Sequence, residues 1–210
     1  MEHDLLGKPV STFPDHALGH RESGEHPYTE ERGVKLFMFY VGGSCRNSNI
    51  ELHDVRFSVG DTIEACYEDL RRQWWGDPES LHLDCWGQVD QADGFDIEIT
   101  AAATEACDER LSFANMGGYD PQEFAELHRD VLLVAPHAKA AKQRALSLVQ
   151  SWALPHKDNL FELETLVDLN KVVADRGYRL RLTKAAIEKP FEFSCDYLPI
   201  GATDAERPAY

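Results

Sequence analysis

The sequence predicts an α+β protein built from two related ββαββ repeats, with mostly antiparallel sheet and helices packed on one face of it. Strand-like and helix-like segments are grouped within each half of the chain instead of alternating as β, α, β, α. The same landmarks recur in the same order, with Gly42-Gly43 returning as Gly117-Gly118 and Gly94-Phe95 as Gly177-Tyr178. This order, with two small insertions in the second copy, indicates a tandem duplication. Apolar residues make up 43% of the chain, which is sufficient for a packed core.

The first repeat is expected over residues 34–109. Lys35–Val41 is an almost unbroken apolar run, typical of a strand buried on both faces. Val55–Val59 alternates between apolar and polar residues, as a half-buried strand does. Two further alternating strands, at 81–86 and 95–99, complete the sheet of this repeat.

A helix is expected between the second and third of these strands. Asp61 is a suitable N-cap, with Glu64 three residues further on, and apolar residues continue at helical spacing to Trp74. The second repeat, residues 110–183, has a comparable helix over Pro136–Trp152. Its expected strands include 111–116 and 178–182.

The last strand of each repeat carries charges of one sign on its outward face. They are acidic in the first repeat, at Asp96 and Glu98, and basic in the second, at Arg179 and Arg181. Two alternatives follow: the two strands meet along complementary edges, or each face meets water.

Both ends of the chain differ from the repeats. Residues 1–33 contain four histidines, three prolines and four glycines with few periodic apolar positions, which predicts a flexible N-terminal arm. Residues 184–210 are expected to form a C-terminal strap, with alternation around Phe191 and Phe193, followed by a loose tail.

Charge and hydropathy exclude several classes of protein. There are 37 acidic and 21 basic residues, and a net charge of −16 has the wrong sign for binding a nucleic-acid backbone. We find no apolar run long enough to cross a membrane and no signal-peptide pattern. We therefore expect neither nucleic-acid nor membrane partners.

The cysteines predict free thiols in a reducing, cytoplasmic environment. Their number, five, is odd, and they form no Cys-x-x-Cys pair. Cys66 and Cys85 fall at apolar positions of a helix and a strand, which favours small core residues. Cys45 follows two glycines in an expected loop and is the thiol to test for reactivity.

The acidity is concentrated in one repeat. Residues 34–109 hold 16 acidic and 5 basic residues, whereas residues 110–183 hold 9 and 10. Such asymmetry predicts a surface for a protein partner or a homo-oligomer, and the alternative is a solvated face.

The repeat preserves two patterns that could carry chemistry. Gly42-Gly43 and Gly117-Gly118 follow corresponding strands, where they favour tight turns or a close approach of the backbone to a ligand. The pairs formed by Glu51 with His53, and by Glu126 with His128, could provide general bases or metal ligands, or could anchor loops.

Two further polar groups are candidates for a ligand site. His82, Asp84 and Trp86 alternate along one strand, and Thr165, Val167 and Leu169 stand at the matching offset in the second repeat. The other group is a dense polar turn formed by His156, Lys157, Asp158 and Asn159.

No complete catalytic or cofactor motif accompanies these residues, so the sequence predicts no bound cofactor and assigns no metal. The leading hypothesis is a non-catalytic protein that binds a partner or a small ligand between its repeats. The alternative is a small, metal-assisted enzyme that uses the Glu-x-His pairs.

Over residues 34–200 the sequence resembles a bacterial family of domains of unknown function, number 1543 among such domains. The motifs that carry the resemblance, besides the glycine-terminated first strand, are Asn49–Val55, His82–Trp86, Asp93–Phe95, Gly117–Tyr119, Glu126–His128 and Pro155–Asn159. The resemblance implies a small cytoplasmic protein and supplies no mechanism.

Overall fold

The computed structural model describes residues 33–101, 108–119, 122–148 and 163–201. Strands dominate and every strand pairing is antiparallel, so the predicted α+β class is confirmed. Within these residues, none of the helices combines the length and apolar character required to cross a bilayer. The strands are β1 (Lys35–Gly43), β2 (Leu52–Gly60), β3 (His82–Gln88), β4 (Gln91–Ala92), β5 (Phe95–Thr100), β6 (Arg110–Tyr119), β7 (Glu126–Ala135), β8 (Leu163–Asp168), β9 (Arg179–Lys184) and β10 (Ser194–Pro199). The helices are α1 (Tyr67–Gln73), α2 (Ala138–Leu148) and α3 (Leu169–Ala174), with short 3₁₀ turns η1 (Glu64–Cys66) and η2 (Pro78–Ser80).

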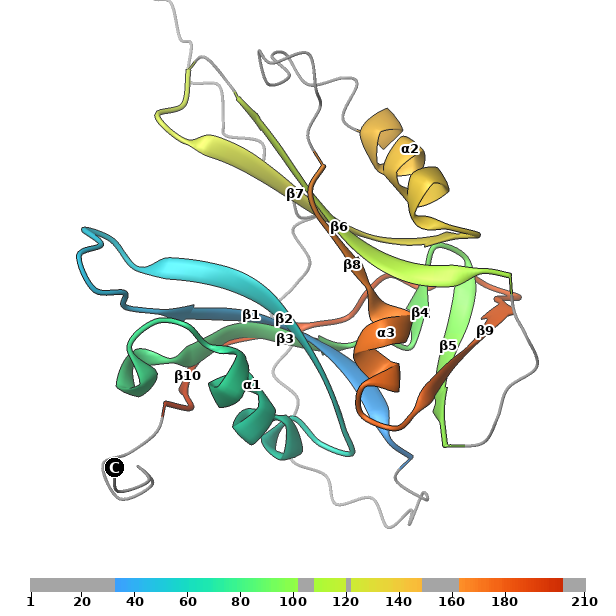
Figure 1. Cartoon of the computed structure of the whole chain (residues 1–210), viewed down its shortest axis with the longest axis horizontal. Coiled ribbons are helices and arrows are strands. Elements are labelled where there is room, and N and C mark those ends of the chain that lie inside the picture. Colours follow the sequence, from blue (N-terminus) through green and yellow to red (C-terminus); the bar gives the residue numbers. More distant parts are fainter. Residues whose placement is uncertain (1–32, 102–107, 120–121, 149–162, 202–210) are drawn as a thin grey trace, which may run out of the picture. The chain divides into compact units, whose positions relative to one another are not determined.

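The strands form three sheets (Figure 1). The four-stranded sheet has the order β10-β3-β1-β2, and α1 packs on one face of it through a cluster that includes Phe39, Leu70 and Leu83. The sheet β7-β6-β8 carries α2, whose Ala141 and Ala145 are buried. Helices thus cover one face of each of these sheets, because each helix has one apolar stripe to bury.

One hydrophobic cluster unites the two predicted repeats. Leu36 and Phe57 from the first repeat lie in it beside Leu111, Phe113 and residues of α3 from the second. The rings of Phe57 and Phe113 meet edge to face, with centroids 5.2 Å apart. The repeats therefore share this central core, and each also has a smaller cluster of its own beside α1 or α2.

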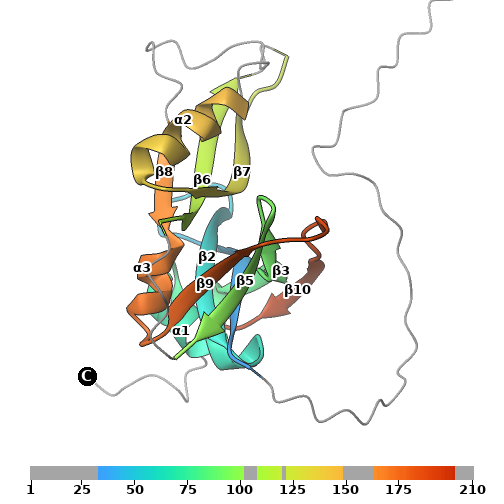
Figure 2. The same ribbon diagram turned by 90° about the vertical axis from the view of Figure 1, so that its right-hand side faces the viewer.

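The third sheet, β4-β5-β9, pairs the last strand of each repeat (Figure 2). Glu98 lies opposite Arg181, and their side chains form an ion pair with 2.9 Å between Oε2 and Nη1. Of the two alternatives for these charged strands, the structure supports the complementary edge. The alignment that equates Gly94 with Gly177 also equates Glu98 with Arg181, so the equivalent strands meet at their equivalent residues.

The hairpins β1–β2 and β6–β7 have matching registers. Gly42 pairs with His53 and Gly117 with His128, and these are the same two positions of each repeat. Each central strand also has a register shift against its third strand at the same place, after Tyr40 and after Asn115. This likeness supports the predicted duplication, which itself stays a prediction.

The strand register changes one of the predicted correspondences. Val41 pairs with Leu83 in β3, and its counterpart Met116 pairs with Leu163 in β8. Position 164, and not Val167, therefore corresponds to Asp84. The correspondence shifts in this strand because part of the insertion in the second repeat lies after β8, where α3 separates β8 from β9.

The start of the helical segment also differs from expectation. Asp61 is not the N-cap: the segment opens with the 3₁₀ turn η1, which Ile63 precedes without a side-chain cap. The Ala65 amide instead faces the hydroxyl of Thr62 at 3.4 Å. A threonine one residue closer to the turn displaces Asp61 from the capping position.

The expectation that all thiols are free is wrong for two cysteines. Cys85 of β3 and Cys195 of β10 lie directly opposite each other, 4.1 Å apart at Cα, and form a disulfide. Cys66 is a buried free thiol as expected, and burial raises its pKa to about 11. Cys45 is also free, and Cys107 falls outside the described residues.

Besides the Glu98–Arg181 ion pair, two further groups of polar contacts within the described residues join elements of different repeats. The first lies at the turn between β4 and β5, where Asp93 and Gly94 have positive φ angles of 52° and 77°. The Asp93 carboxylate accepts hydrogen bonds from Arg144 of α2 and from the backbone amide of Val134.

The second contact centres on Asp69 of α1. Its carboxylate accepts hydrogen bonds from Ser58 (2.6 Å), Gln73 (2.9 Å) and the guanidinium of Arg176, which follows α3. Burial alone would raise the pKa of Asp69, but the hydrogen bonds from Ser58 and Arg176 outweigh burial and hold the pKa below its usual value.

The substitution Asp69→Asn should destabilise the protein by about 1–3 kcal/mol, because it leaves the Arg176 charge without its counter-ion. Since the folded pKa is lowered, this stabilisation is complete above pH 3.8, the ordinary value for Asp, and is lost as the pH falls through the folded pKa. Urea unfolding of the two proteins at neutral pH and near pH 3 measures both effects. The matched control is Glu68→Gln, whose exposed pair with Arg72 should contribute at most about 0.5 kcal/mol. An equal loss of unfolding free energy in Asp69→Asn and Glu68→Gln would contradict the prediction.

Candidate functional site

Two histidines meet over a glycine on one face of the four-stranded sheet. Gly42 of the central strand β1 pairs with His53 of β2 on one side and with His82 of β3 on the other. Directly paired residues of antiparallel strands point to the same face. The register therefore places both imidazoles beside the position where Gly42 has no side chain.

A β-bulge adds Asp84 to the same face. Tyr40 pairs with Cys85 and the next residue, Val41, pairs with Leu83, so Asp84 is the extra residue on β3. His82 and Asp84 share a face as predicted. The predicted third member of that face, Trp86, instead packs against the cluster under α1, because the bulge shifts the alternation of the strand.

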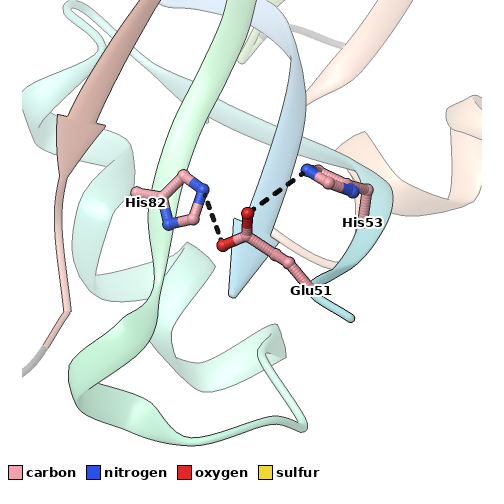
Figure 3. Close-up of side chains that lie close together, drawn as sticks. All are labelled: Glu51, His53 and His82. Atoms are coloured by element: carbon pink, nitrogen blue, oxygen red, sulfur yellow. Dashed lines mark ion pairs between the residues drawn. The ribbon is translucent and has the colours of Figure 1, made fainter. Parts of the chain in front are cut away.

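Glu51, the residue directly before β2, is the fourth member of the group. Figure 3 shows its carboxylate between the two imidazoles. Its oxygens lie 3.2 Å from His82 Nε2 and 3.9 Å from His53 Nε2. Asp84 lies 3.3 Å from His53 Nε2 and 3.6 Å from His82 Nε2. Two imidazole nitrogens and two carboxylates thus converge; we call Glu51, His53, His82 and Asp84 the His-carboxylate cluster.

His82 is fixed in one orientation and one tautomer. Its side chain is 2% exposed, and Nδ1 lies 2.8 Å from the backbone carbonyl oxygen of Ser80. A carbonyl can only accept, so Nδ1 carries the hydrogen and donates it. Nε2 is left to face the carboxylates, and an outer hydrogen bond of this kind on Nδ1 is usual for metal-binding histidines.

Gly42 keeps the centre of the cluster open. A β-carbon at this position would lie 2.6 Å from His82 Nε2 and 2.9 Å from Asp84 Oδ2. The expectation of tight turns at Gly42-Gly43 and Gly117-Gly118 is wrong, since both pairs lie within strands. At Gly42 the missing side chain provides space between the polar groups, and no unusual backbone angle is involved.

One carboxylate oxygen of the cluster has no hydrogen-bond donor. Asp84 Oδ2 is buried and accepts no hydrogen bond within the described part of the chain, although His53 Nε2 lies 3.3 Å away. Buried carboxylate oxygens are rarely left without a donor or a cation. One ligand atom each from Glu51, His53 and His82 lie within 4.8 Å of one another, a spacing at which one ion can bind all three.

The donor set fits a transition-metal ion. Imidazole nitrogen with carboxylate oxygen is a common ligand combination for Zn²⁺ and for non-haem Fe²⁺, and carboxylates suit Mn²⁺. His53 and Glu51 are 35% and 45% exposed, so the cluster is open to solvent on one side. That side offers an entry path and room for a further ligand.

Two tyrosines flank the imidazoles. Tyr40 stacks on His53 with ring centroids 5.3 Å apart, and Tyr197 of β10 lies over His82 at 4.5 Å. Burial raises the pKa of Tyr40, as do the nearby carboxylates of Asp130 and then Asp84. Tyr40 therefore remains a neutral phenol.

The other predicted candidates are placed as follows. Glu126 and His128 of β7 keep the spacing of the first repeat, with 3.8 Å between Oε2 and Nε2, beside Gly117. The strand that would supply a third group begins at residue 163, so the corresponding position 162 falls outside the described residues. The same holds for His156, Lys157, Asp158 and Asn159.

The sequence analysis missed three contributors to the site. Tyr40 stands two residues before Gly42 in a strand, and this alternation could have placed it on the same face. The Ser80 carbonyl has no sequence signal, because any residue provides one. Tyr197 comes from the C-terminal strap, far from His82 along the chain, and no local pattern connects them.

Comparisons with known proteins agree with the sequence analysis. Residues 48–99 match the model of the family described as Domain of Unknown Function (DUF1543). A crystal structure of the protein Il1583 from Idiomarina loihiensis is similar, with a TM-score of 0.60 and 28% identity, over 80% of this chain and 99% of that one. No curated protein matches the chain. The predicted resemblance to DUF1543 is thus confirmed over residues 48–99, a range that includes all four residues of the His-carboxylate cluster.

Proposed function

We propose that this protein binds a divalent transition-metal ion at the His-carboxylate cluster. The observation that carries the proposal is the convergence of the Glu51 carboxylate with the ligand nitrogens of His53 and His82 beside Gly42, with Asp84 next to both imidazoles. The closest nitrogen–oxygen pair in the cluster is His82 Nε2 with a Glu51 oxygen, at 3.2 Å. On the other side of the cluster, His53 Nε2 lies 3.3 Å from Asp84. An ion at this position would neutralise the two carboxylates and give the buried Asp84 Oδ2 a partner.

A cluster held only by protons accounts for less of the geometry. A second proton on His82 would satisfy the carboxylate of Glu51, 3.2 Å away. It would leave Asp84 Oδ2 without a donor, because His53 Nε2 lies 3.3 Å away but forms no hydrogen bond to this oxygen. An unsatisfied buried carboxylate oxygen destabilises a fold. A metal ion bonds to several groups at once, which one proton cannot do.

The open side of the cluster favours binding of a small ligand to the metal. Three protein ligands, as Glu51, His53 and His82 would provide, leave the fourth position of a tetrahedral ion to water or to a small anion, as in catalytic zinc sites. A ligand-binding protein therefore stays the first candidate, with the ligand placed within the first repeat and not between the repeats, and the metal-assisted enzyme stays the second. A protein partner at the acidic repeat and a cytoplasmic location stay predictions.

Titration with Zn²⁺, Co²⁺ and Mn²⁺ by calorimetry should show one high-affinity ion per chain. His53→Gln and Glu51→Gln should each weaken binding by at least about tenfold, since even outer-shell changes at metal sites reach that size. His128→Gln is the matched control, at the corresponding position of β7, and should bind as the wild type does. Affinity should fall as the pH is lowered, because protons compete for the imidazoles. Equal affinity in His53→Gln and His128→Gln would contradict the proposal.

Gly42→Ala offers a test that leaves every ligand in place. Its methyl group would occupy the space between His82 Nε2 and Asp84 Oδ2, so we expect loss of metal binding by at least about tenfold. Thermal unfolding without metal measures any general destabilisation separately. A folded Gly42→Ala protein that binds metal normally would show that the centre of the cluster is not the binding position.

A further inference from the structure

The disulfide Cys85–Cys195 adjoins the His-carboxylate cluster. Cys85 is the residue after Asp84, and Cys195 lies two residues before Tyr197, whose ring covers His82. We propose that this disulfide is a redox latch that regulates the metal site, an inference that rests on the proposed function. In the oxidised state it holds β10 against β3, and in the reduced state it lets Tyr197 leave His82.

The register of β10 makes Tyr197 depend on the bond. Cys195 pairs with Cys85, and the next pair is Leu198 with Leu83. Asp196 and Tyr197 therefore lie in an irregular stretch of β10 opposite Asp84, between two anchored pairs. Tyr197 is 64% exposed, so its contact with His82 has little other support than the two flanking pairs.

The segment around the disulfide has separate anchors on both sides. Ile200 is 2% exposed, its carbonyl accepts a hydrogen bond from Arg71 Nε at 2.7 Å, and its amide bonds to the Leu81 carbonyl. On the other side, the Lys189 amide donates to the side chain of Gln91 at 2.6 Å. Reduction should therefore loosen the segment between these anchors without releasing the whole strap.

The bond is placed where a reductant can reach it. Cys195 is exposed on the edge strand β10, and Cys85 on the neighbouring strand β3 is half-buried. A dithiol reacts by attack of its thiolate on one sulfur, which gives a mixed disulfide and a cysteine thiolate; its second thiol then releases the other cysteine. In total, two electrons and two protons pass from the dithiol to Cys85 and Cys195, and the dithiol becomes a disulfide. In a reducing compartment such a bond would be transient and responsive to redox state.

The latch predicts a redox-dependent affinity. The experiment compares oxidised protein with protein that is reduced with dithiothreitol and then desalted without oxygen. Each sample is titrated with Mn²⁺, and free Mn²⁺ is measured by electron paramagnetic resonance. Mn²⁺ is chosen because it prefers oxygen and imidazole ligands to thiolates. Reduction should weaken binding by about two- to tenfold, the effect of losing one aromatic contact that holds His82 in place. The number of free thiols, measured by thiol titration, should rise by two per chain on reduction.

Three variants sharpen the test. Cys85→Ala with Cys195→Ala should bind like the reduced wild type whether or not dithiothreitol is used. Cys45→Ala, the control, should keep the full redox difference. Tyr197→Ala should weaken binding in the oxidised protein and abolish most of the redox difference. Hydrogen exchange over residues 191–197 should accelerate on reduction while Ile200 stays protected.

The outcomes separate the two proposals. Equal Mn²⁺ affinity in the oxidised and reduced wild type, with weakened binding in His53→Gln, would overturn the latch and leave the metal site. Failure to bind Mn²⁺, Zn²⁺ or Co²⁺ in either redox state would overturn the proposed function and the latch together. A redox difference that persists in Tyr197→Ala would show that the disulfide does not act through His82.

Discussion

The pairing of β1 with β2 on one side and with β3 on the other is the constraint on which the site depends. Gly42 faces His53 across one ladder and His82 across the other, so a slip of one residue in either pairing would turn an imidazole to the opposite face. The bulge at Asp84 also depends on register: one extra residue in β3 changes the alternation of the strand, so that the Asp84 carboxylate points toward the histidines. The apolar residues of β1 under α1 hold this register in place.

The two repeats depend on each other for their core. Each hairpin alone would expose the apolar face that Phe57 and Phe113 bury together. Asp69 with Arg176, and Asp93 with Arg144, add polar contacts that fix how the elements of the two halves meet. The rigid frame formed in this way supports a cluster whose outer side remains open, which is the arrangement expected for a binding site on a stable scaffold.

Much of the fold could be predicted from residue patterns. The buried run Lys35–Val41, the alternation in 55–59 and the matching strands of the second half all correspond to observed strands. Residue chemistry also identifies four candidates for the site, but as two separate groups, Glu51 with His53 and His82 with Asp84. Nothing in their spacing shows that β3 lies beside β1, because contacts between distant segments leave no local pattern. The capping expectation at Asp61 failed for a different reason, since a neighbouring threonine competes for the same role.

Residue patterns alone predict the class of the fold, the position of most strands and the residue types available for metal binding. These follow from local properties: hydrophobic periodicity, glycine position and the chemistry of single side chains. Three features come from the folded chain: two histidines and two carboxylates share one face, Gly42 leaves space between them, and Cys85 meets Cys195. Each of these depends on strand order and register, which are fixed by the packing of segments far apart in the chain.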